Sequence, residues 1–185
     1  MYVKVRLAMV SALALTLTLS LAAQKPQGLM GDLSKDVSSV HTKIIGLAKA
    51  IPAGAYDWKP SPEVRSTGEV LMHVAADNYF MPTMAGVTPP AATGINGKDY
   101  KTAEAFEKRK MSRDEIIAEV DKSFTFLQTA MNGVTDAKLD APIDMFGQKS
   151  TGRAMWVGTT THLHEHLGQL IAYARSNKVT PPWSK

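Results

Sequence analysis

The sequence predicts an all-α protein, an up-and-down four-helix bundle that follows a signal peptide. In four segments, apolar residues recur every three or four positions, which is the period of an amphipathic helix. We find no run of alternating apolar and polar residues long enough to favour a sheet. Two of the four segments also begin with a helix start signal. Four long helices in one chain imply a bundle.

The first two helical segments have clear boundaries. Within residues 30–47, apolar side chains form a narrow seam along one helix face, and Pro52 closes the segment. The second segment opens with Ser66-Thr67-Gly68-Glu69, a capping box in which the serine hydroxyl and the glutamate carboxylate each accept a hydrogen bond from the other residue's backbone amide. This helix is expected to end near Pro82.

The third and fourth segments are bounded in the same way. Ser112-Arg113-Asp114-Glu115 repeats the capping box, and the helix that follows should end at Gly133. The fourth helix should begin at residue 150 or 151 and run through Arg175. It ends before Pro181-Pro182 because proline cannot continue a helix.

Two connections between these helices are long. Residues 87–97 are rich in Pro and Gly and should lack regular structure, and connections of this length often carry function. A short helical piece is expected after it, around Thr102 to Lys110. The connection between the third and fourth helices, which is the third connection of the chain, runs from Val134 to Lys149. It contains Pro142 and Gly147 and could hold a small hairpin.

Residues 1–23 have the layout of a signal peptide, with Lys4 and Arg6 followed by an uncharged run from Leu7 to Ala23. The mature domain would be residues 24–185, periplasmic or secreted. If the leader is not cleaved, the run is just long enough to anchor the protein in a membrane. The chain has no Cys, which excludes a lipoprotein anchor, disulfides and thiolate metal ligands. Without Lys4 and Arg6, 19 basic residues face 17 acidic ones, a balance too mild to indicate nucleic-acid binding.

The strongest chemical pattern is Thr161-His162-Leu163-His164-Glu165-His166-Leu167-Gly168-Gln169, within the fourth helix. At about 100° per residue, His162 and His166 lie about 40° apart around the helix axis, so both imidazoles can reach one ion. Gln169 and Tyr173 share this stripe and could orient a ligand imidazole. His164 points the other way.

A third ligand has to come from another helix, and His73, on the inward face of the second helix, is the natural source. Asp77 lies one turn further on that face and could be a fourth ligand, an acceptor that orients an imidazole, or a catalytic proton acceptor. Three neutral histidines suit Zn²⁺, Ni²⁺, Fe²⁺ or Mn²⁺ and leave positions open for water or substrate. The alternative is a metal-free interaction module with all three histidines in its core, because such His spacings also arise by chance.

Taken together, these residues resemble the DinB/YfiT-like superfamily of metalloenzymes over nearly the whole mature chain. The similarity includes residues 55–66, which lead into the second helix, and the last helix with the Pro-Pro segment after it, residues 166–184. The resemblance implies a four-helix bundle, frequently dimeric, with a three-histidine metal site at His73, His162 and His166. Family activities include thiol-dependent transfer, isomerase and hydrolase chemistry. Many relatives carry paired histidines before Gly-Gln, whereas here Glu165 precedes His166, about 100° away around the helix.

Two functional hypotheses follow. In the first, the protein is an enzyme that acts on a small molecule. Its metal ion lowers the pKa of a bound water or thiol, and Asp77 accepts the proton that this water or thiol releases. Hydrolysis is favoured over thiol transfer because low-molecular-weight thiols are scarce outside the cytoplasm. In the second, a non-catalytic bundle holds a metal or a small ligand, because no Ser-His-Asp order or Gly-rich phosphate loop supplies an independent catalytic signature.

Overall fold

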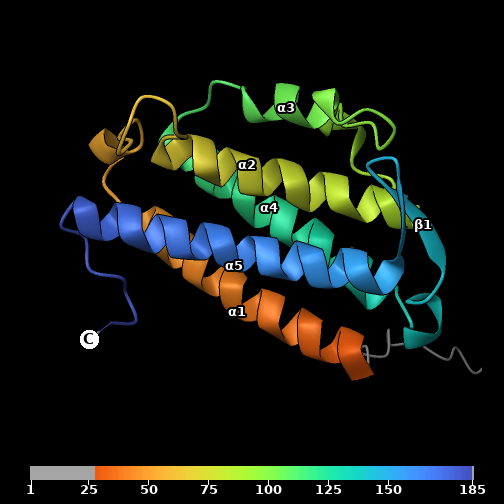
Figure 1. Ribbon diagram of the computed structural model, residues 1–185. Helices are drawn as coiled ribbons and strands as arrows, with labels where there is room; N and C mark the ends of the chain where they lie inside the picture. The colour runs from red at the N-terminus through yellow and green to blue at the C-terminus, as the bar shows by residue number, and fades with distance from the viewer. Residues whose placement is uncertain (1–27, 185) are drawn as a thin grey trace, which may run out of the picture.

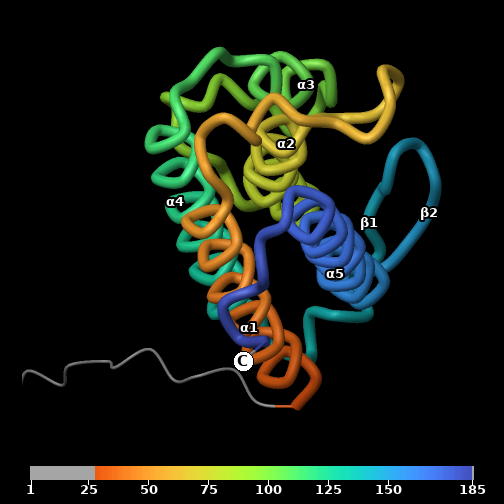
Figure 2. Tube along the Cα trace, turned by 90° about the vertical axis from the view of Figure 1, so that its left-hand side faces the viewer, coloured from red at the N-terminus to blue at the C-terminus, as the bar shows by residue number. Residues whose placement is uncertain are grey.

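Four long helices form a bundle in the computed structural model, which describes residues 28–184. They are α1 (Gly28–Ala50), α2 (Thr67–Phe80), α4 (Arg113–Asn132) and α5 (Gly152–Ser176). The short helix α3 (Lys101–Glu107) lies on the outer side of α2 (Figure 1). Helices α1 and α2 each contact both α4 and α5, so α1 and α2 occupy opposite corners of the bundle (Figure 2). The predicted helical bundle is therefore present.

The predicted up-and-down order is wrong. The colours in Figure 1 show that α2 and α4 run in one direction, whereas α1 and α5 run in the other. Helix α3 is the reason, because it carries the chain back along α2 before α4 begins. The chain thus starts α4 at the end of the bundle where α2 also started.

The prediction of a purely all-α protein is also wrong, because the third connection holds a two-stranded antiparallel sheet. Strand β1 (Pro142–Met145) pairs with β2 (Gln148–Thr151), with Ile143 opposite Ser150. This is the small hairpin that the sequence allowed in that connection. Its two-residue turn has positive φ at Phe146 and at Gly147, 56° and 81°, as a type I′ turn requires.

Phe146 is an unusual residue for a turn position with positive φ, which favours Gly, Asn and Asp. Its ring lies 6.2 Å from that of Phe80 and 5.7 Å from that of Tyr100, measured between centroids. Contact with these two rings therefore accounts for the phenylalanine better than the local backbone preference does. The hairpin tip consequently reaches the end of α2 and the residue that precedes α3.

The helix boundaries follow the local signals in the sequence. The Ser66 amide donates to Glu69 Oε2 at 2.7 Å and the Glu69 amide donates to Ser66 Oγ at 3.3 Å, and Ser112 and Glu115 make the same reciprocal pair. Thr151 caps α5 through the Ala154 amide. Both predicted capping boxes are confirmed.

Helix α2 is buried almost all the way round, and this burial positions polar residues inside the protein. Every residue of α2 except Glu69 is buried, because α4 and α5 cover its inner side and α3 covers its outer side. His73 and Asp77 are consequently only 6% and 8% exposed. Two titratable side chains on such a helix need partners, since burial without them is costly.

The predicted signal peptide, residues 1–23, lies outside the described residues. Of the helices within residues 28–184, none has the length and apolar character needed to cross a membrane.

Candidate metal centre

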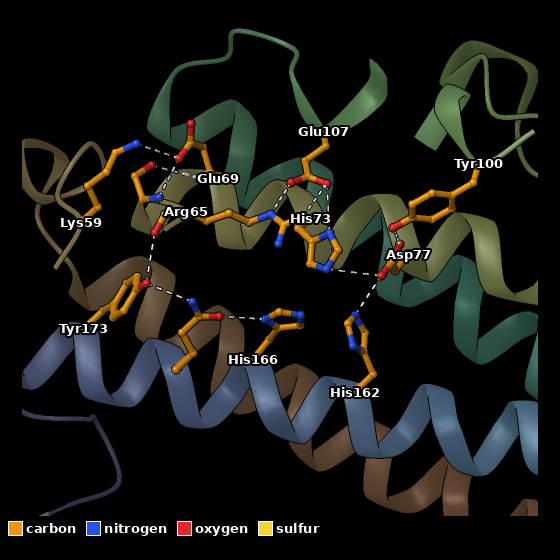
Figure 3. Close-up of polar contacts among 12 residues, drawn as sticks. Lys59, Arg65, Glu69, His73, Asp77, Tyr100, Glu107, His162, His166 and Tyr173 are labelled. Carbon is orange, nitrogen blue, oxygen red and sulfur yellow. Dashed lines mark hydrogen bonds and ion pairs between the residues drawn. The ribbon is translucent and has the colours of Figure 1, made fainter. Parts of the chain in front are cut away.

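The structure brings His73 on α2 together with His162 and His166 on α5 (Figure 3). Each histidine offers a ring nitrogen that lies within 4.8 Å of those offered by the other two. The ring centroids are 4.4 to 5.3 Å apart, and each pair of rings meets edge to face. This convergence arises because α2 and α5 pack side by side and because His162 and His166 are one helical turn apart.

His166 is oriented by the two residues that the sequence placed on its stripe. Its Nδ1 donates to Gln169 Oε1 at 2.9 Å, and Gln169 Nε2 donates to the Tyr173 hydroxyl at 2.9 Å. The Tyr173 hydroxyl in turn donates to the backbone carbonyl of Arg65 at 3.1 Å. This chain of hydrogen bonds keeps the proton of His166 on Nδ1, so that Nε2 is the nitrogen available to a metal.

His73 is oriented by Glu107, a residue that the sequence analysis did not identify. Glu107 Oε2 lies 2.9 Å from His73 Nδ1, and since a carboxylate only accepts, Nδ1 is the donor. Arg65 also donates to Glu107 through Nε, and its Nη2 lies 3.4 Å from Oε2. Burial alone would raise the pKa of Glu107, but the hydrogen bonds donated by His73 and Arg65, together with the positive charge of the Arg65 guanidinium, outweigh burial and lower it. The carboxylate is therefore ionised.

Asp77 lies beside two of the three imidazoles. Its Oδ2 is 2.8 Å from His162 Nε2 and 3.5 Å from His73 Nε2. Its Oδ1 accepts a hydrogen bond from the Tyr100 hydroxyl at 3.2 Å. Burial and the negative charge of Asp77 both raise the pKa of Tyr100, so the phenol keeps its proton and remains a donor. Tyr100 thereby fixes the orientation of the carboxylate.

Two buried nitrogens of the cluster have no hydrogen bond. Within the described residues, Nε2 of His162 and Nε2 of His166 are buried and have no hydrogen-bond partner, because the Asp77 contact with His162 lacks hydrogen-bond geometry. Buried polar atoms normally have a partner, and leaving one unsatisfied costs about 1–3 kcal/mol. An ion that accepts both nitrogens as ligands would remove this cost.

The protonation state of His166 also suits a metal ligand. The pKa of His166 is lowered to about 4, mainly because burial disfavours the charged ring. The hydrogen bond that Nδ1 donates to Gln169 opposes this shift only in part. The ring is therefore neutral at pH 7, which is the form that coordinates metal.

The spacing of the cluster suits a divalent ion after a small adjustment. Ligand atoms that share a tetrahedral ion at 2.0–2.1 Å are about 3.3 Å apart, which is closer than the 4.8 Å limit of this cluster. The rings would therefore have to move inward by less than about 1 Å each, within reach of small χ rotations. Three neutral nitrogen donors without a thiolate fit Zn²⁺, Ni²⁺, Fe²⁺ or Mn²⁺ and leave a position for another molecule.

Two neighbouring residues of α5 lie outside the centre. His164 points away from the cluster and its Nε2 contacts Asp36 Oδ2 on α1 at 2.6 Å. The Glu165 side chain is 76% exposed, and its Oε2 lies 3.9 Å from His162 Nδ1. Both positions agree with the helical angles deduced from the sequence.

The fold and the site together place this protein among helical-bundle proteins in which three histidines converge from the second and the last long helix. The sequence profile of the DinB superfamily matches residues 38–170, which is more than half of the chain. This protein belongs to the DinB superfamily. No curated protein matches the chain.

Solved structures of similar proteins share this fold. A DinB-like protein from Bacillus cereus ATCC 10987 is 17% identical, with a TM-score of 0.66 over 83% of this chain and 95% of that chain. A DinB-like protein from Bacillus subtilis is 21% identical, with a TM-score of 0.61 over 80% and 93% of the two chains. A conserved protein from Enterococcus faecalis is 13% identical, with a TM-score of 0.67 over 80% and 96%. At these identities the likeness concerns the fold alone.

Proposed function

We propose that this protein is an exported metal-dependent enzyme, and that its reaction is hydrolysis of a small molecule. The observation that carries the proposal is the pair of buried, unpartnered imidazole nitrogens on His162 and His166, in a cluster whose third member is His73. In a metal-free core, two unsatisfied buried nitrogens destabilise the folded state, whereas in a metal site they are expected as ligands. When bound, a divalent ion supplies Lewis acidity, which polarises a substrate and lowers the pKa of a coordinated water.

The residues around the cluster have separate tasks in this proposal. His73, His162 and His166 would hold the ion, with Nε2 as the free nitrogen of each ring. Glu107 and Gln169 each accept a hydrogen bond from Nδ1 of one ligand, which fixes the ring orientation and increases the basicity of the other nitrogen.

Asp77 is the proton acceptor in the proposed reaction. Its Oδ2 lies beside the histidine cluster, 2.8 Å from His162 Nε2, and its Oδ1 accepts a hydrogen bond from Tyr100. A carboxylate held in this way accepts a proton without first reorganising, which is the requirement for a general base. The proton that the attacking water releases would bind to Oδ2, while Tyr100 keeps its hydrogen bond to Oδ1.

Hydrolysis is preferred over thiol transfer for two reasons. The proposed location outside the cytoplasm offers few low-molecular-weight thiols, and the chain has no Cys whose side chain could act as the thiol instead. Hydrolysis also needs only one organic substrate beside the ion. The leader of residues 1–23 supports export, and the weak net charge gives no reason to propose a nucleic-acid substrate.

Reconstitution tests this proposal. Protein loaded in turn with Zn²⁺, Ni²⁺, Fe²⁺ and Mn²⁺ is incubated with panels of esters, amides and phosphoesters, and separately with a thiol and an electrophile. We expect metal-dependent hydrolysis, and Asp77→Asn should lower kcat by about 10²- to 10⁴-fold, the usual contribution of a general base. Glu165→Gln is the matched control, because Glu165 is an exposed carboxylate near the same cluster, and it should retain activity.

Two other outcomes would overturn the hydrolase assignment. Turnover only in the presence of a thiol would identify a transferase. Tight metal binding without turnover on any panel would favour the second functional hypothesis, a binding protein that performs no chemistry.

A further inference from the structure

A cavity lies away from the histidine cluster. It is formed by the last turns of α4, the start of α5, the 3₁₀ helix Met81–Ala85 and the base of the hairpin, and it has a volume of about 590 Å³. None of the candidate metal ligands lines it. Cavities between about 300 and 1,000 Å³ commonly hold a small molecule.

The wall of this cavity is apolar. Met84, Phe126, Ile143 and Trp156 line it, and Trp156 is only 1% exposed. These side chains come from four different elements, so the cavity is built by the tertiary fold and is not a surface feature of one helix. Such a wall would bind the aliphatic or aromatic part of a ligand through burial of apolar surface.

The cavity is open to solvent, because several of the residues that line it are exposed. Gly86, Gly133 and Ala141 contribute to the lining and are exposed. Gly86 ends the 3₁₀ helix with φ of +82°, a conformation that strongly favours glycine, so a larger side chain is disfavoured at this point of the opening.

A single charge accompanies the apolar wall. Lys138 is the one charged residue among the described residues that line the cavity. It is exposed, and no carboxylate of the described chain lies within ion-pair distance of it. A ligand with an apolar body and one negative group would place the body against the aromatic wall and leave its charge near this ammonium.

We propose that this cavity binds an amphipathic carboxylate, a molecule with an apolar body and one anionic end. Charge complementarity with Lys138 selects an anion, and the absence of any second charged lining residue within the described chain excludes a dianion or a polar ligand such as a sugar phosphate. This site is separate from the histidine cluster and does not depend on the proposed function.

Binding of decanoate tests the proposal, with decanol and decyltrimethylammonium as neutral and cationic molecules of the same chain length. Titration calorimetry on protein produced from the full sequence should give one site per chain, with decanoate binding more tightly than decanol and decyltrimethylammonium binding least. To locate the site, Trp58 and Trp183 are replaced by Phe, which leaves Trp156 as the only tryptophan. Decanoate should then change the fluorescence of Trp156, which lines the cavity.

Matched variants separate the cavity from non-specific adsorption. Thr129→Phe places a ring inside the cavity and should weaken decanoate binding at least about tenfold. Thr125→Phe is its control, because Thr125 is also exposed on α4, makes the same hydrogen bond to the carbonyl four residues earlier, and does not line the cavity. Lys138→Met should weaken decanoate about two- to fivefold and leave decanol unchanged, as expected for an exposed ion pair.

Three results would overturn the proposal. They are the absence of saturable decanoate binding, equal affinity for decanoate and decyltrimethylammonium, and equal weakening by Thr125→Phe and Thr129→Phe. A change in oligomeric state caused by Thr129→Phe alone, without decanoate binding to the parent protein, would instead assign this face to contact between two copies.

Discussion

The carboxylate of Glu107 gives the sharpest test of how the metal centre is built. Its hydrogen bond with His73 Nδ1 links helix α2, which carries one of the three candidate ligands, to the short helix α3, and it directs Nε2 of His73 toward the other two histidines. Glu107→Gln keeps the size of the side chain and an accepting oxygen but removes the negative charge. Loss of a carboxylate behind a ligand histidine typically weakens metal binding by 10- to 100-fold.

The size of the effect follows from what each substitution removes. Glutamine still accepts from His73, so the expected loss for Glu107→Gln is about tenfold, which corresponds to about 1.4 kcal/mol. Glu107→Ala also removes the acceptor and leaves Arg65 without its partner, so its loss should approach about 100-fold.

Competition with a chromogenic chelator measures zinc affinity directly at pH 7. Glu104→Gln is the matched control, because Glu104 is an exposed acidic residue on the same helix and contacts none of the candidate ligands. Zinc affinity of Glu107→Gln within twofold of the parent protein, with a folded circular-dichroism spectrum, would refute the proposed role of Glu107.

Three further predictions concern stability and are accessible by unfolding experiments. The pKa of His166 is about 4 in the folded protein and about 6.5 in the unfolded chain, so the unfolded chain binds an extra proton between these two pH values. The unfolding free energy of the metal-free protein should therefore fall by up to about 2 kcal/mol as the pH drops through this window. Urea titrations should show a shallower pH dependence for His166→Asn, and an unchanged pH dependence would contradict the assignment. Ser112→Ala removes the capping hydroxyl of α4 and should cost about 1 kcal/mol in urea unfolding, whereas Ser184→Ala near the C-terminus should cost nothing measurable. A metal at 100 times its Kd should stabilise the folded protein by about 2.7 kcal/mol, so a chelator should lower the Tm by roughly 5–10 °C, and no shift in Tm would indicate that the folded protein does not bind the metal.

The sequence predicted those parts of the molecule that depend on local spacing. The capping boxes at Ser66 and Ser112 involve residues three positions apart, and His162 and His166 share a helix face because they are four positions apart. His73 could be included because it was a lone histidine on an inward helix face, and the family resemblance named the same position.

The parts that the sequence did not predict depend on long-range arrangement. Glu107 lies 34 residues from His73 and reaches it only because α3 folds back over α2. The same return of the chain makes α2 and α4 parallel, which helix periodicity does not reveal. Tyr100 reaches Asp77 for the same reason, and no local pattern distinguishes it from an ordinary loop tyrosine.

Elemental analysis of the native protein tests the central claim most directly. Mass spectrometry of the metal content, after purification from the compartment in which the protein resides, should find about one divalent ion per chain. His73→Ala and His162→Ala should each carry less than about a tenth of that amount, and His164→Ala, whose ring faces away from the cluster, should carry the full amount. Native protein without metal, or equal metal content in all three variants, would contradict the account.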